Sequence, residues 1–171
     1  MNNYFKTYLG IIIFSFLSLT QCEDKLRLEE GDIIIFEYEY ENFAWGHQHI
    51  HWIIDNDGYV RTEIDDPAYL GPPIREMFDG FIITSDTISK EDIEYYQKLV
   101  PDAIKGDFES NPGNRADFGA VVFNVYVKKS DEDSYHKYLL SLQSDVLDSI
   151  NTHRDAEKIV QWMQELNPNL P

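Results

Sequence analysis

Residues 32–41, Asp32-Ile33-Ile34-Ile35-Phe36-Glu37-Tyr38-Glu39-Tyr40-Glu41, decide the fold because large apolar and aromatic residues alternate there with glutamates. A two-residue period is typical of a strand with one buried and one exposed face. The pattern predicts a strand that follows the turn residue Gly31. Its core face carries Ile34, Phe36, Tyr38 and Tyr40, and its other face carries Glu37, Glu39 and Glu41.

A second alternation follows a short connection over residues 42–46. Ile50, Trp52 and Ile54 occupy one face, and the opposite face carries His47, His49, His51 and Asp55. The tripeptide at 56–58, Asn-Asp-Gly, is a strong hairpin signal, and residues 59–64 alternate again. The first half of the chain therefore begins as an antiparallel meander.

The rest of the chain predicts two helices and a hairpin, with loops between them. Residues 65–87 lack a sustained period, apart from a short edge strand over 81–83. Ser89, with Asp92 three residues later, predicts the start of a helix that ends before Pro101. The remaining predictions are a loop over 106–114, a hairpin over 121–143, and a helix that Thr152 and Asp155 open and Asn167-Pro168 ends.

This order of elements predicts an α+β domain over residues 31–171. Strands and helices are segregated along the chain, as in an antiparallel sheet with helices on one side. We expect a meander plus a hairpin in the sheet and two helices packed on one face. With about 140 residues, such a domain can bury a core without cross-links.

The N-terminal residues indicate secretion. Residues 8–19 are apolar apart from hydroxyls and one glycine, they follow Lys6, and they are too short to cross a bilayer as a helix. Leu19-Thr20-Gln21-Cys22 resembles the lipobox of bacterial lipoproteins, although Gln21 stands where Gly, Ala or Ser is usual. The resemblance implies a signal peptide over 1–21 and a lipid on Cys22. The alternative is an incidental or buried cysteine.

An anchor of this kind implies a place in the cell envelope. Several acyl chains on one cysteine hold a protein permanently on a membrane, whereas one chain does so only marginally. Residues 22–30 would then be an acidic linker on a protein of the outer membrane. Glu23-Asp24-Lys25 resembles the short signals that export some lipoproteins to the cell surface, and the alternative is a solvated linker start.

The charge excludes several partners. The formal net charge is -17, and removal of the leader takes away only the basic residue Lys6. A polyanion such as nucleic acid would be repelled, and so would anionic lipid headgroups. We therefore expect the membrane to be contacted only through the lipid. Cys22 is the single cysteine, so no intramolecular disulfide can form.

The polar face of the first two strands is the main candidate site. Antiparallel pairing of Phe36, Tyr38 and Tyr40 with Ile50, Trp52 and Ile54 places the glutamates beside the histidines. His47, His49 and His51, with Glu37 or Glu39, offer ligands suited to zinc. The alternative is a solvated sheet face without any cofactor. Phe43 and Trp45, in the connection, either cap the core or form a contact patch for a partner.

The whole mature region resembles small uncharacterised envelope lipoproteins of diderm bacteria. The residues that carry this likeness are Trp45-Gly46, Ile53-Ile54-Asp55, Asp57-Gly58, Asp117-Phe118-Gly119 and the closing segment 156–166. The order of elements is also similar to that of emfourin-type protease inhibitors. We expect a lipid-anchored, non-enzymatic domain that binds an envelope protein or glycan. The alternatives are a metal-binding protein and an inhibitor of secreted proteases.

Overall fold

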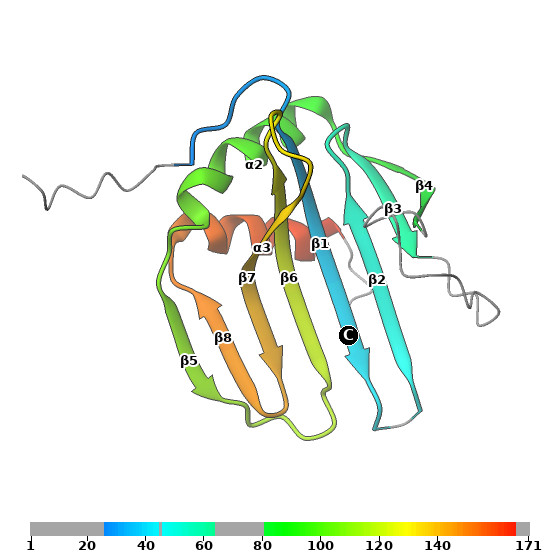
Figure 1. Ribbon diagram of the computed structural model, residues 1–171. Coiled ribbons are helices and arrows are strands. Elements are labelled where there is room, and N and C mark those ends of the chain that lie inside the picture. The colour runs from blue at the N-terminus through cyan, green and yellow to red at the C-terminus, as the bar shows by residue number, and fades with distance from the viewer. Residues whose placement is uncertain (1–25, 45, 64–80, 167–171) are drawn as a thin grey trace, which may run out of the picture.

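The computed structural model describes residues 26–44, 46–63 and 81–166. Within these ranges, eight strands form one antiparallel sheet and two helices accompany it, so the α+β class is confirmed (Figure 1). The elements are β1 (Ile33–Asn42), β2 (Gln48–Ile54), β3 (Tyr59–Glu63), β4 (Phe81–Thr87), α2 (Lys90–Ala103), β5 (Phe108–Pro112), β6 (Ala120–Lys128), β7 (His136–Ser144), β8 (Leu147–Asn151) and α3 (Arg154–Leu166).

The two halves of the chain meet at the centre of the sheet. The strand order is β4-β3-β2-β1-β6-β7-β8-β5, so β1 pairs with β2 on one side and with β6 on the other. The predicted meander corresponds to β1, β2 and β3, and the predicted hairpin corresponds to β6 and β7. The strand at 81–87 is an edge strand, as expected, but it is longer than the predicted segment.

The predicted pairing of the first two strands is confirmed. Phe36 lies opposite Ile54, and Tyr38 lies opposite Trp52. The rings of Tyr38 and Trp52 stack with centroids 5.3 Å apart. All four side chains are buried, because the alternation directs them to the same face of the sheet.

The turn between β2 and β3 is also as predicted. The Asp55 side chain accepts hydrogen bonds from the backbone amides of Asp57 and Tyr59, at 3.0 and 2.9 Å. Gly58 has a φ of +85°, a conformation that a side chain would strain. The Asn-Asp-Gly sequence therefore forms a hairpin turn.

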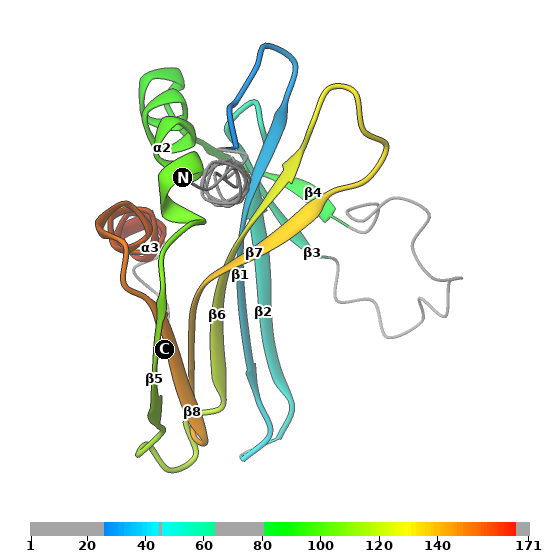
Figure 2. The ribbon, with the colours of Figure 1, turned by 60° about the vertical axis from the view of Figure 1, so that its left-hand side comes forward.

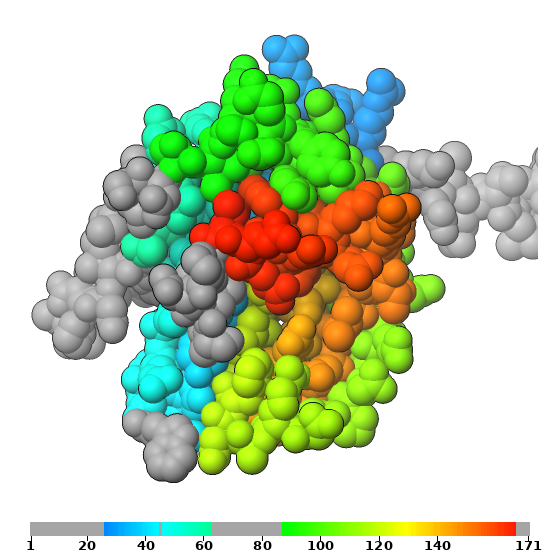
Figure 3. Space-filling view, turned by 180° about the vertical axis from the view of Figure 1, so that it is seen from behind, coloured from blue at the N-terminus to red at the C-terminus, as the bar shows by residue number. Residues whose placement is uncertain are grey.

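Both helices contribute to the core cluster that the alternating residues of β1 begin. Ile93, Val100 and Ala103 of α2 and Ala156, Ile159 and Met163 of α3 are buried in it. Trp162 of α3 stacks on Tyr96, with ring centroids 4.0 Å apart, and meets the edge of the Phe36 ring, with centroids 5.2 Å apart. Figure 2 shows α2 and α3 beside one another, and the space-filling view shows them in contact (Figure 3).

The start of α2 is confirmed, but its predicted end is wrong. The Ser89 hydroxyl accepts a hydrogen bond from the Asp92 amide at 3.1 Å and so caps the helix. Pro101 lies inside the helix, which continues to Ala103. A proline in the last turn removes one hydrogen bond, and burial of Val100 and Ala103 offsets that loss.

Three further expectations are corrected. The predicted loop 106–114 contains β5, which pairs with β8, and β8 itself was not predicted. Thr152 does not cap α3, because its hydroxyl donates to the Asp107 carbonyl at 3.0 Å. The Asp155 amide instead donates to Nδ1 of His153 at 3.2 Å.

Candidate functional site

The predicted face of glutamates and histidines forms a ladder across β1 and the start of β2. We call His47, His49, His51, Glu37, Glu39 and Glu41 the His/Glu ladder. Its hydrogen bonds run diagonally, joining His47 to Glu41 at 3.3 Å, His49 to Glu39 at 3.4 Å and His51 to Glu37 at 3.0 Å. Each imidazole therefore lies beside a carboxylate, as the pairing predicted.

The ladder is graded from an exposed end to a buried end. The His47 and Glu41 side chains are 57% and 45% exposed, whereas those of His51 and Glu37 are 15% and 5% exposed. The imidazole rings follow one another, with centroids 6.0 Å apart from His47 to His49 and 5.7 Å apart from His49 to His51. The His47 end of the ladder is thus accessible to solvent, and the His51 end is buried in the domain.

Phe43 extends the ladder at its exposed end. Its ring stacks on the His47 imidazole, with centroids 4.8 Å apart, and the residue is 68% exposed. The Phe43 ring is therefore not part of the buried core. Trp45, the other half of the predicted patch, lies outside the described residues.

The buried end of the ladder centres on Glu37, which sequence reasoning placed among solvated carboxylates. The Asn124 amide donates to Glu37 at 2.7 Å, and the Tyr126 hydroxyl donates at 2.9 Å. The Lys137 ammonium lies 3.1 Å from the same carboxylate. Together with His51, these groups come from β2, β6 and β7, so Glu37 links its own strand, β1, to three others at the centre of this face.

The partners of Glu37 control its protonation. Burial alone would raise the pKa of Glu37, but the hydrogen bond from His51, the charge of Lys137 and the hydrogen bonds from Asn124 and Tyr126 together lower it to about 2. Burial raises the pKa of Tyr126 to about 12, and the negative charge of Glu37 adds to that shift. Glu37 is therefore a carboxylate at neutral pH.

Asn124, Tyr126 and Lys137 were missed as members of this site. In residues 120–128, Asn124 and Tyr126 alternate with apolar residues, but the sequence does not show which strand lies next to this one. The pairing of β1 with β6 sets Glu37 opposite Asn124. The alternation indicates the side of the strand on which Asn124 and Tyr126 lie, but no signal in the sequence identifies β1 as the neighbouring strand.

A small apolar cluster continues the same face toward the other end of β1. Ile35, Ile53 and Tyr126 are buried there, with Ile33 and Tyr135 packed against them. The face that carries the His/Glu ladder is therefore apolar and buried near the β6–β7 connection and polar near Phe43. A partner that contacts the His/Glu ladder would meet ionisable groups with one exposed aromatic ring at their end.

The ladder is not a preformed metal site. Across residues 26–44, 46–63 and 81–166, no three His, Cys, Asp or Glu side chains are grouped so as to hold a metal ion. The predicted set of His47, His49, His51 and Glu39 is brought to one face, but each ring is turned toward a carboxylate. Zinc binding there would require the rings to rotate.

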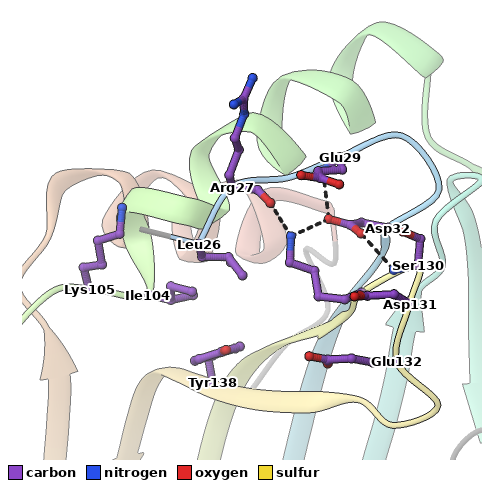
Figure 4. Close-up of a pocket in the computed structure, with 11 residues that line it drawn as sticks. Leu26, Arg27, Glu29, Asp32, Ile104, Lys105, Ser130, Asp131, Glu132 and Tyr138 are labelled. Atoms are coloured by element: carbon purple, nitrogen blue, oxygen red, sulfur yellow. Dashed lines mark hydrogen bonds and ion pairs between the residues drawn. The ribbon is translucent and has the colours of Figure 1, made fainter. Parts of the chain in front are cut away.

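A hollow of about 670 Å³ lies where residues 26–32 pass the end of α2 and the β6–β7 connection (Figure 4). The Asp32 carboxylate accepts hydrogen bonds from Lys129 at 2.7 Å and from the Ser130 amide at 3.0 Å. Leu26 lies on the apolar side of the hollow with Ile104 and Tyr138. The Lys129 ammonium also donates to the Arg27 carbonyl, so Lys129 links residues 27–32 to the β6–β7 connection.

The predicted signal peptide and Cys22 lie outside the described residues, as do Glu23-Asp24-Lys25. Leu26 and Leu28, in the predicted linker, pack against the core cluster. No helix in the described part of the chain has the length and apolarity needed to span a membrane.

No protein-family model matches the chain, and a search of curated proteins finds no match.

Proposed function

We propose that this protein is a lipid-anchored binding protein of the cell envelope. Its domain would be tethered through Cys22 and would capture a protein partner without catalysing a reaction. The lipobox-like sequence supports the anchor, and the exposed end of the His/Glu ladder, with Phe43 beside it, supports the binding role. The exposed stack of Phe43 on His47 is the observation that carries this proposal.

In this proposal, the helices cover one face of the sheet and leave the other face for a partner. We infer that α2 and α3 pack on one face, since their buried residues join the core cluster of Phe36 and its neighbours. Glu39 and Glu41 alternate along β1 with residues of that core face, so their side chains lie on the opposite face. That face is then the one left for a partner.

The partner in this proposal is a protein segment with basic and apolar side chains. The Glu39 and Glu41 side chains are 35% and 45% exposed, in a chain whose net charge is -17. Phe43 supplies an aromatic anchor of the kind that concentrates binding energy at interfaces. Carboxylates around such an anchor select complementary positive charge and speed association.

Capture of the partner from envelope extracts by the full chain tests the proposal. Phe43→Ala and the double variant Glu39→Gln, Glu41→Gln should each keep the melting temperature and lose at least about tenfold in captured protein. Val146→Ala is the matched control, because Val146 is an apolar residue that is 82% exposed on another turn. Equal capture by all variants contradicts the surface, and capture of a glycan in place of a protein contradicts the partner class.

A further inference from the structure

One end of the sheet holds the segment that leads to the anchor. We propose that this end, formed by residues 26–32 and the β6–β7 connection 129–135, faces the membrane, and that Phe43 lies at the opposite end of the domain. The inference rests on the anchor of the proposed function and deepens that function, because it assigns the side from which a partner reaches Phe43.

Residues 27–32 are held to the β6–β7 connection by polar contacts. The Asp32 side chain is 3% exposed, and it accepts hydrogen bonds from the Lys129 ammonium at 2.7 Å and from the Ser130 amide at 3.0 Å. The Glu29 amide donates to the same carboxylate at 2.9 Å. Because removal of one partner from a buried ion pair is strongly destabilising, we expect this segment to move with the domain as one body.

The chain from the anchor to the domain is short. Leu26 and Leu28 pack against the core cluster, and Leu26 lines the hollow that Figure 4 shows. Cys22 precedes Leu26 by four positions. An extended chain spans at most about 3.6 Å per residue, so the α-carbon of Leu26 lies within about 14 Å of that of Cys22. A lipid on Cys22 therefore holds this end of the domain beside the headgroups.

Strand β1 separates this end from Phe43. It has 10 residues, and it runs from Ile33, which follows the clamped segment, to Asn42, which precedes Phe43. At about 3.3 Å per residue, β1 is about 30 Å long. Figure 1 shows the N-terminal segment and the β1–β2 connection at opposite ends of the sheet.

Charge opposes a domain that lies flat with its ladder face on the membrane. The Glu39 and Glu41 side chains on that face are 35% and 45% exposed, in a chain whose net charge is -17. Anionic headgroups repel such a face. The short connection to Cys22 and this repulsion together favour an upright domain. A partner then reaches Phe43 from the aqueous space.

Energy transfer from the protein to the membrane tests this orientation. The full lipidated chain is placed in vesicles of phosphatidylcholine and phosphatidylglycerol whose headgroups carry an acceptor dye. A donor dye is attached to Asp131→Cys in the β6–β7 connection or to Val146→Cys in the β7–β8 turn, since an acylated Cys22 has no free thiol. Both positions are exposed, and the strand pairing sets them at opposite ends of the sheet.

The two labels should differ in their distance from the headgroups by about the length of β1, so we expect at least about twofold more transfer from Asp131→Cys than from Val146→Cys. Equal transfer, or more transfer from Val146→Cys, overturns the orientation. Mass spectrometry of the same preparation measures the lipid on Cys22. Absence of the lipid contradicts the proposed anchor, whereas a lipidated chain with equal transfer contradicts only the orientation.

A lysine variant tests whether the clamp sets the orientation. Lys129→Met removes the ammonium that binds Asp32 and should reduce the difference in transfer between the two labels. Lys158→Met is the matched control, because Lys158 pairs with Asp155 at the same distance of 2.7 Å but lies on α3. It should leave the difference unchanged. Circular dichroism establishes that both variants are folded, and equal effects of the two variants contradict the role of the clamp.

Discussion

The Lys137 ammonium lies 3.1 Å from the Glu37 carboxylate, although their strands, β7 and β1, are separated by β6. The ion pair reaches across the Tyr126 ring, whose centroid is 5.2 Å from the ammonium and whose hydroxyl also binds Glu37. One carboxylate thus connects three adjacent strands through side chains as well as backbone.

Removal of that carboxylate should destabilise the domain strongly. Glu37→Ala leaves the buried amide of Asn124 and the Tyr126 hydroxyl without their acceptor, which costs about 2–3 kcal/mol. Urea unfolding measures the loss. Glu41→Ala is the control, because the Glu41 side chain is 45% exposed and its removal should cost less than about 0.5 kcal/mol. Equal losses would mean that Glu37 has no special structural role.

The Glu37 carboxylate should make the free energy of unfolding depend on pH in the acidic range. The pKa of Glu37 is lowered from 4.5 to about 2 in the folded protein, so its contribution is complete above about pH 4.5 and is lost as the pH falls through about 2. The free-energy difference between wild type and Glu37→Gln should therefore shrink over that interval. A difference that stays constant from pH 7 to pH 2 would contradict this linkage.

The core depends on Trp162 at the contact of the two helices. Trp162 is 5% exposed and meets both Tyr96 and Phe36, so Trp162→Ala should cost about 3–5 kcal/mol in urea unfolding. Phe43→Ala removes a ring that is 68% exposed and should change stability by less than about 0.5 kcal/mol. Similar values for the two variants would rule out this difference in packing.

The cap of α2 by Ser89 can be compared with Thr152, which the sequence predicted as a cap of α3 and which does not cap it. Ser89→Ala removes the acceptor for the Asp92 amide and should cost about 1 kcal/mol. Thr152→Ala removes an exposed hydrogen bond to Asp107 and should cost about 0.5 kcal/mol. Chemical denaturation ranks the two variants, and a larger effect at Thr152 would restore the cap that the sequence predicted.

The anchor is tested by the mass of the mature protein. A diacylglycerol and an N-linked acyl chain on Cys22 should both appear in mass spectra of protein extracted from membranes, with Cys22 as the first residue. Cys22→Ser should keep the leader and release no lipidated form. Mature protein that starts elsewhere, or carries no lipid, would remove the basis for a place in the envelope.

The strands were predictable where burial on one face produces alternation. Phe36 and Tyr38 reveal β1, and Val121 and Phe123 reveal β6, because each pair points into the core from every second position. β5 gave no such signal, since all of its residues are exposed and its pairing with β8 comes from backbone hydrogen bonds. Pro101 led to a wrong prediction of the end of α2, because a proline in the last turn of a helix removes only one backbone hydrogen bond.

The site was predictable only in part. The spacing of His49 and His51 and of Glu39 and Glu41 placed them on a shared face, and the structure confirms that placement. The burial of Glu37 was not predictable, because its donors are 87 and 89 residues away in the chain. Local alternation indicates which way a side chain points, but not which distant strand will cover it.

The edge strand β5 affects whether a neighbouring copy of the protein can pair with the sheet. β5 forms one border of the sheet, and it carries Glu109 and ends at Pro112, which has no amide hydrogen to donate. A neighbouring copy that tried to extend the sheet there would meet like charge and an incomplete row of donors. The border thus discourages growth into amyloid-like fibrils without any disulfide or closed barrel.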